Sequence, residues 1–214
     1  MKISKTILLI VLIISSNKTN AQFITDINGR PFVEIKYTDI EGSPYLNDNW
    51  SVGFAKAKHN NKTYELKRVR YDIYKDELEY DVAGSYFRLS DQITEFSCGD
   101  GTFRNGFTNA EPLTIRSFYQ ILYDGKIKLL KRIAAQIATE KLYGSASETK
   151  RFLKEEALFI QKNGILTRIK KDKKTILEIL SDKQPQIEAF IKEQKLKPTR
   201  EEDIVKIIEK YDGL

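Results

Sequence analysis

The chain has 214 residues but only one cysteine, one histidine and one tryptophan. The single cysteine, Cys98, cannot form an intramolecular disulfide, so core packing must hold the fold, and a chain of this length can bury enough surface for that. One histidine, His59, and one cysteine are too few ligands for a zinc site. We therefore expect no disulfide, no metal and no other cofactor.

Long apolar runs are also scarce, and the longest is ILLIVLII at residues 7–14. Lys2 and Lys5 precede this run, and Asn20-Ala21 follows it after a polar stretch, which is the order of a secretory signal peptide. Because spanning a bilayer takes about 20 apolar residues, we expect cleavage after Ala21 and no transmembrane segment in the mature chain. The predicted location is the periplasm or the extracellular space. Covalent lipid attachment is excluded because no cysteine lies near Ala21.

A large excess of charge is missing from the mature chain as well. The formal net charge is +6, but three of these charges come from Lys2, Lys5 and Lys18 of the leader, which leaves +3. A charge this small does not indicate a nucleic-acid partner. The aromatic residues, 11% of the chain, are almost all Tyr and Phe and favour strands.

Apolar residues alternate with polar ones through most of residues 31–133, which predicts half-buried strands. The runs include Val33-x-Ile35-x-Tyr37 and Leu78-x-Tyr80-x-Val82. Between Leu66 and Val69 the alternation changes phase, so either a β-bulge near Lys67-Arg68 or a bend between two strands would restore one apolar face.

Two turns predict hairpins in the second half of this region. Asp124-Gly125 stands between two apolar-rich runs, which predicts a hairpin with a type I′ turn. Residues 162–164, Lys-Asn-Gly, predict a second hairpin. The segment between them, residues 134–151, is ambiguous: Ile133 and Ile137 suit a short helix, whereas residues 144–147, GSAS, suit a loop.

The pattern becomes helical after Lys170. Apolar residues follow helical spacing in three segments: Ile176, Leu177 and Leu180; Ile187, Phe190 and Ile191; and Ile204, Ile207, Ile208 and Tyr211. Pro185 suits a first helical turn, Thr199 and Glu202 match a capping box, and Gly213 can end the last helix. The predicted fold is α+β: a mostly antiparallel β domain at residues 22–170, followed by a three-helix unit at residues 171–214.

Four segments together resemble a family of uncharacterised exported proteins of Bacteroidota-type bacteria. They are GSPYLN at residues 42–47, VRYDIYKDELE at 69–79, LYDGK at 122–126 with LLK at 129–131, and the tail from Ile165, which includes EEDIV at 201–205 and Tyr211. The resemblance implies export and a two-part build. It implies no activity and no catalytic residue.

Carboxylates are the only abundant acid–base groups, and five of them, Asp72, Asp76, Glu77, Glu79 and Asp81, lie close together in the sequence. A pair of carboxylates is what a glycosidase uses. Acids at alternate positions of a hairpin more often occupy its solvated face. The spacing also differs from that of a calcium loop. We favour the solvated face over a catalytic or calcium site.

Three other features have a functional and a structural interpretation. His59 and Cys98 could serve nucleophilic catalysis, but a solvated turn histidine and a buried free thiol are favoured. Tyr45 and Trp50 beside Asn and Asp could bind a glycan or peptide, but core anchors are favoured. The basic run of Arg168, Lys170, Lys171, Lys173 and Lys174 could contact anionic envelope surfaces weakly, but a solubilising connector is favoured.

The sequence therefore predicts an exported, non-enzymatic envelope or secreted protein that binds a partner protein, a glycan or a matrix component. The alternative is a carboxylate-dependent hydrolase that acts on glycans, and a third hypothesis is a purely structural envelope component. The absence of a catalytic motif such as Gly-x-Ser-x-Gly argues against the enzyme. The absence of internal repeats argues against an extended structural role.

Overall fold

The computed structural model describes residues 29–31, 37–99, 101–108, 116–141 and 148–214. The strands are β1 (Arg30–Pro31), β2 (Ile40–Glu41), β3 (Ser51–Ala57), β4 (Thr63–Asp72), β5 (Glu77–Val82), β6 (Ser85–Leu89), β7 (Ile93–Cys98), β8 (Gly101–Arg104), β9 (Tyr119–Asp124), β10 (Lys128–Lys141), β11 (Glu148–Lys162) and β12 (Ile165–Ile169). The helices are α2 (Lys173–Ile179), the 3₁₀ turn η1 (Ser181–Lys183), α3 (Gln184–Glu193) and α4 (Glu201–Asp212). The chain is thus mostly β, with its helices near the C-terminus.

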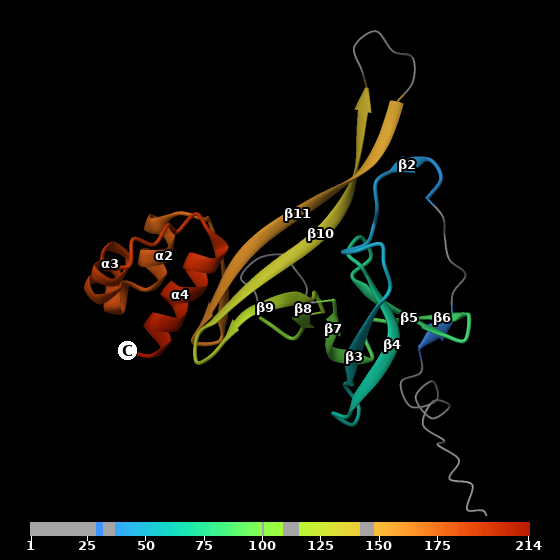
Figure 1. Ribbon diagram of the computed structural model, residues 1–214, viewed down its shortest axis with the longest axis horizontal. Coiled ribbons are helices and arrows are strands. Elements are labelled where there is room, and N and C mark those ends of the chain that lie inside the picture. The colour runs from blue at the N-terminus through green and yellow to red at the C-terminus, as the bar shows by residue number, and fades with distance from the viewer. Residues whose placement is uncertain (1–28, 32–36, 100, 109–115, 142–147) are drawn as a thin grey trace, which may run out of the picture.

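The strands form one sheet in the order β1-β6-β5-β4-β3-β7-β8-β9-β10-β11-β12. All neighbours on this path are antiparallel, and only β2 adds in parallel, beside β11. Figure 1 shows the helices packed at one end of the β10–β11 hairpin and the β3–β8 region alongside its middle. The α+β class with a mostly antiparallel sheet is as the sequence predicted.

A β-bulge in β4 keeps one face of this strand apolar. Ser51 pairs with Val69 and Gly53 pairs with Leu66, so β4 has one residue more than β3 across this interval. Leu66 and Val69 consequently both point into the core, and both are buried. The predicted bulge near Lys67-Arg68 is therefore confirmed, and the alternative of a bend between two strands is not needed.

Aromatic rings fill the hydrophobic core of the β3–β8 region. The ring of Phe96 lies 4.9 Å from Tyr71, 5.0 Å from Phe103 and 4.9 Å from Phe118, measured between centroids. All four residues are at most 1% exposed. Arg132 of β10 closes one side of this core through an ion pair of 2.9 Å with Asp76.

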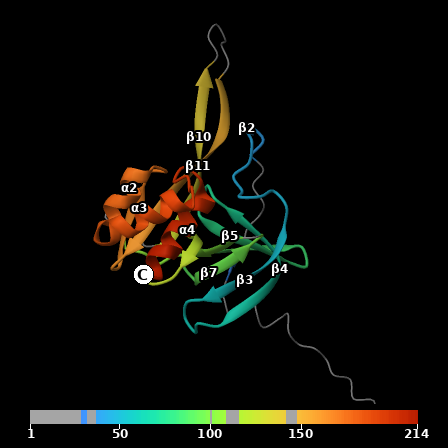
Figure 2. The same cartoon turned by 60° about the vertical axis from the view of Figure 1, so that its left-hand side comes forward.

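The β10–β11 hairpin is long and projects beyond the rest of the molecule. Figures 1 and 2 both show its far end standing clear of the other elements. β10 runs without interruption through Ile133 and Ile137, so the short helix that was one interpretation of this ambiguous segment does not form. The reason is the continuous pairing with β11, from Lys128 opposite Gln161 to Lys141 opposite Glu148. The predicted loop at residues 144–147 lies outside the described residues.

One of the two predicted turns is confirmed and the other is corrected. Asn163 and Gly164 both have positive φ and join Lys162 to its partner Ile165, as a type I′ turn requires. Asp124 and Gly125 join a hairpin too, but Asp124 pairs with Lys128 and neither residue has positive φ. The turn is therefore longer than a type I′ turn.

A carboxylate from the C-terminal helix accounts for this difference. Asp212 accepts hydrogen bonds from the backbone N–H groups of Lys126 (3.2 Å) and Ile127 (3.1 Å) and from the hydroxyl of Tyr123 (3.0 Å). A Cβ atom at Gly125 would collide with this carboxylate. Glycine is needed here for the close approach of Asp212 and not for a left-handed turn.

The helices pack against β9–β12 through a second hydrophobic cluster. The predicted helical stripes supply it, except for Phe190, which is only half-buried and outside the cluster. The other members are all buried: Ile176, Leu177, Leu180, Ile187, Ile191, Ile204, Ile207, Ile208 and Tyr211. On the sheet side they meet Leu129, Leu158 and Ile160. The last strand ends at Ile169, and the first helix begins at Lys173. The helices and the sheet share this one hydrophobic cluster.

The ends of α3 and α4 contain the residues that the sequence predicted there, except at the N-terminus of α4. Pro185 lies in the first turn of α3, and Gly213 caps the C-terminus of α4. The predicted capping box of Thr199 and Glu202 is wrong, because α4 begins at Glu201 and its N-cap is Arg200, which makes no side-chain capping bond. Asp203 instead accepts the backbone N–H of Lys197 at 2.9 Å and ties the preceding turn to the helix.

Residues 1–21, with the predicted signal peptide and its cleavage site, and the predicted strand at Val33 and Ile35 lie outside the described residues. None of the helices in the described ranges has the length and apolar character needed to cross a membrane.

Candidate binding surface

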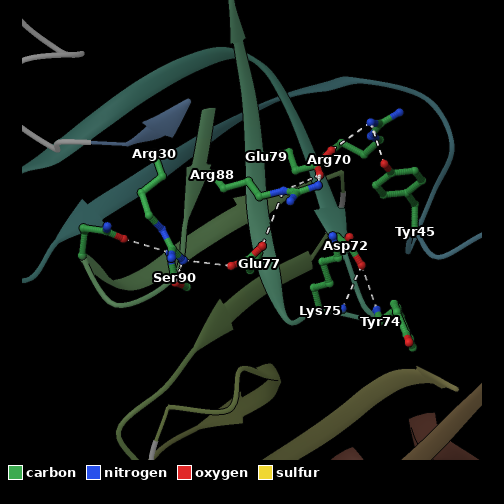
Figure 3. A network of polar contacts seen from close by, with 11 residues as sticks. Arg30, Tyr45, Arg70, Asp72, Tyr74, Lys75, Glu77, Glu79, Arg88 and Ser90 are labelled. Carbon is green, nitrogen blue, oxygen red and sulfur yellow. Dashed lines mark hydrogen bonds and ion pairs between the residues drawn. The ribbon is translucent and has the colours of Figure 1, made fainter. Parts of the chain in front are cut away.

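The second face of β4, β5 and β6 carries a row of alternating charges. We call this row the charge ladder; its members are Arg30, Glu77, Arg88, Glu79 and Arg70 (Figure 3). Glu79 lies at its centre, 2.8 Å from Arg70 and 3.0 Å from Arg88, and Glu77 pairs with Arg88 at 3.5 Å and with Arg30 at 3.1 Å. Beside the ladder, Arg68 pairs with Asp81 at 3.0 Å.

The acids of this face are buried or half-buried, so the predicted solvated face is wrong. The side chain of Glu79 is 0% exposed and that of Asp81 is 4% exposed. Asp72 is 1% exposed and caps the following turn, where its Oδ1 accepts the N–H groups of Tyr74 (3.0 Å) and Lys75 (2.9 Å). Burial raises the pKa of Asp72, although the N–H bonds from Lys75 and Tyr74 partly counter this shift. Alternation showed which residues share a face, but not that other segments cover it.

Asp76 points the other way and belongs to the core. Its carboxylate pairs with Arg132 and accepts the hydroxyl of Tyr71. Burial raises the pKa of Asp76, and the charge of Arg132 opposes that shift. Asp76 is therefore separated by the sheet from the acids with which the sequence grouped it.

The five acids consequently do not form the carboxylate pair of a glycosidase. Four of them face an arginine, and Asp72 is engaged by the backbone of its own turn. A catalytic pair needs one carboxyl group that can donate a proton and another that can act as nucleophile or base. An arginine pair occupies the carboxylate oxygens that such a reaction would need. The geometry thus gives no support to the hydrolase alternative.

Aromatic side chains cover the end of the charge ladder at Arg70. The guanidinium of Arg70 lies 3.6 Å from the ring centroid of Tyr45 and 4.5 Å from that of Trp50, and it donates to the Tyr45 hydroxyl at 2.9 Å. Tyr45 and Trp50 belong to none of the hydrophobic clusters, so their predicted role as core anchors is wrong. They shield a buried arginine instead.

Trp50 connects this cover to an exposed patch. Its ring stacks on Tyr86 at 5.7 Å between centroids, and the guanidinium of Arg68 lies 5.4 Å from it. Next to it is Val52, which is 65% exposed and stands opposite the bulge of β4. We call the residues Trp50, Val52, Arg68 and Tyr86 the Trp50 surface. The sequence pointed to Trp50 but not to its near neighbour Val52, nor to Arg68 and Tyr86, which only strand pairing brings beside it.

The single histidine and the single cysteine have the environments that the sequence predicted. His59 is exposed in the turn between β3 and β4. Cys98 is 4% exposed, its Sγ lies 3.6 Å from the Ser51 hydroxyl, and burial raises the pKa of its thiol. His59 and Cys98 are thus on different parts of the sheet, and no group of three metal-ligating side chains occurs in the ranges that the structure describes.

The basic run is compensated by glutamates from the helices. Lys171 lies 4.0 Å from Glu201, Lys173 2.8 Å from Glu188 and Lys174 3.9 Å from Glu178. Asp172 caps α2 by accepting the Thr175 N–H at 2.8 Å. These pairs leave the run with much less free charge than its sequence suggested, which favours the solubilising connector over an anionic surface as its role.

An open groove of about 470 Å³ lies where α3 and α4 end. Its lining is Phe190, Gln194, Leu196, Lys206, Glu209, Lys210 and Gly213. Helix C-termini carry partial negative charge, and two lysines and a glutamate add charges of both signs. The groove therefore selects no single kind of ligand.

The chain was compared with models of protein families, with curated proteins and with solved structures, and none of them matches it. The resemblance to exported proteins of Bacteroidota stays a prediction.

Proposed function

We propose that the chain is an exported, non-enzymatic binding protein of the cell envelope or the extracellular space, and that its partner docks on the Trp50 surface. The observation that carries this proposal is the exposed Val52 beside a stacked Trp50, Tyr86 and Arg68. Tryptophan, tyrosine and arginine dominate the energetic centres of protein interfaces.

The charge ladder supports the proposal because it holds this surface in place. Arg70 is fixed by Glu79 on one side and by the Tyr45 hydroxyl on another, and its guanidinium packs against Trp50. A side chain that is already ordered loses less conformational entropy when a partner binds. The ladder is therefore the support of a rigid binding surface.

The packing around Trp50 favours a protein over a glycan as the partner. A sugar ring binds by stacking on an open aromatic face. Trp50 is half-buried, has Tyr86 stacked on it and has two guanidinium groups within 5.4 Å of its centroid. An apolar protein side chain can still pack on Val52 and on the exposed edge of this cluster.

The test is affinity capture from envelope fractions with tagged protein, in which Val52→Glu is compared with Ile165→Glu. Ile165 is the matched control because it is also a strand residue, is 60% exposed and lies on β12. We expect one partner protein to be retained by the wild type and by Ile165→Glu and lost with Val52→Glu. A partner lost equally with both variants, or with neither, would contradict a role of this surface.

A further inference from the structure

The projecting end of the β10–β11 hairpin has one covered edge and one open edge. We call residues 136–141 of β10 and 148–153 of β11 the arm. On the β11 edge, Ile40 and Glu41 of β2 pair with Lys150 and Arg151. On the β10 edge, the N–H of Ala135 donates to the carbonyl of Ile73 at 3.0 Å, and beyond Ala135 no other described segment pairs with β10.

The direction of the backbone groups identifies the residues of the open edge. Along a strand, successive residues direct their N–H and C=O groups to opposite edges. Since Ala135 faces away from β11, Ile137 and Thr139 do so as well. Their N–H and C=O groups are thus available for a further strand.

We infer that this edge pairs with the same edge of a second copy of the chain, antiparallel and across a two-fold axis. Unpaired strand edges are templates for another chain. An isologous contact uses one patch twice and closes, which makes the symmetric dimer the commonest assembly. In both views the arm projects from the body (Figures 1 and 2).

The sequence of the edge is complementary to itself. With Ala138 opposite Ala138 of the second copy, Ile137 lies opposite Thr139 of that copy, and Gln136 lies opposite Glu140 of that copy. Pairs of β-branched residues favour antiparallel pairing, and the amide of Gln136 can donate to the carboxylate of Glu140. No like charges meet in this register.

The β10 edge of the arm also lacks the charged residues and prolines that usually prevent an exposed edge from pairing with another chain. Residues 136–139, QIAT, contain no proline and no charge, and the charged Glu140 and Lys141 come only at the end of β10. Ile137 pairs with Phe152, whose ring packs against Tyr37 and Tyr74. Tyr74 is 39% exposed, so a second arm would also cover apolar surface next to the edge.

Sedimentation equilibrium or light scattering of the purified exported protein over a concentration series tests this inference. We expect a monomer–dimer equilibrium for the wild type and a monomer for Thr139→Pro. Proline removes the N–H that faces the open edge, whereas the hydrogen bonds to β11 come from the residues on either side. The control is Thr139→Val, which keeps the N–H and should keep the dimer.

Hydrogen exchange provides a second measurement that does not depend on the folding of the proline variant. In the wild type, the amides of Ile137 and Thr139 should exchange more slowly at high than at low protein concentration. A wild type that is monomeric at every concentration would overturn the inference. A dimer that persists in folded Thr139→Pro would overturn it equally, and so would a wild-type dimer in which exchange at Ile137 and Thr139 does not change with protein concentration.

Discussion

At the scale of single residues, the environment of Glu79 differs most clearly from the prediction. The sequence predicts this acid on a solvated face, yet Glu79 is fully buried between Arg70 and Arg88. A buried charge is tolerated only when it is paired and hydrogen-bonded, because desolvation otherwise costs several kcal/mol. Removing the carboxylate would take away the negative charge beside the buried guanidinium of Arg70.

We therefore expect Glu79→Ala to lower the free energy of unfolding by about 3–5 kcal/mol, measured by chemical denaturation. Glu178→Ala is the control, since Glu178 pairs with Lys174 where the two side chains are 62% and 86% exposed. For such an exposed pair the loss should be below about 1 kcal/mol. Equal effects of the two substitutions would mean that the charge ladder contributes no more than a surface ion pair.

Asp212 links pH to the docking of the last helix. Partial burial alone would raise its pKa, but hydrogen bonds from Ile127, Tyr123 and Lys126 outweigh burial, so the pKa of Asp212 lies below its ordinary value. A carboxyl whose pKa is lower in the folded state stabilises the fold above its unfolded pKa, and this contribution is lost as the pH falls through the folded pKa.

Asp212→Asn should consequently destabilise the protein at neutral pH by about 1 kcal/mol, as expected for hydrogen bonds to a charged group near the surface. The difference from the wild type should shrink as the pH falls below about 4, the ordinary pKa of aspartate. Urea denaturation at several pH values measures it. A difference that stays constant with pH would show that the charge of Asp212 is not involved.

At the scale of elements, α4 shows how a sequence pattern and its packing agree. Its apolar stripe repeats at helical spacing, and Ile204, Ile207 and Ile208 are each 0% exposed in the cluster shared with the sheet. A helix of this length has little stability in water by itself, so the contact with the sheet is what keeps it folded.

Ile207→Asp should lower the free energy of unfolding by several kcal/mol, because an unpaired charge would enter this cluster. Thermal and chemical denaturation measure the loss. Glu202→Ala on the same helix is the control, since Glu202 has a side chain that is 72% exposed, and its effect should be within about 0.5 kcal/mol. An unchanged melting temperature of Ile207→Asp would show that the stripe faces solvent.

At the scale of the whole molecule, one sheet connects three features that are far apart in the sequence. The Trp50 surface lies on β3–β6, the arm extends from the middle of the β10–β11 hairpin, and the helices pack at its other end. The proposed partner and the second copy would therefore bind at different places. A dimer joined through the arms would present two Trp50 surfaces, and this would strengthen binding to a partner that itself has two sites.

The sequence by itself determined the features that depend on local periodicity. The strands with alternating apolar residues, the turn at Asn163-Gly164 and the three helical stripes were predicted, because each follows from side chains a few residues apart. The bulge in β4 was one of two alternatives that the change of phase allowed. The tertiary structure decided the rest. Long-range pairing with β11 made a strand of residues 134–141, the approach of Asp212 lengthened the turn at Gly125, and the cover of Tyr45 and Trp50 turned a face predicted to be solvated into buried ion pairs. These outcomes depend on pairing across a hairpin and on contacts between residues 25 and 86 positions apart, for which periodicity carries no information.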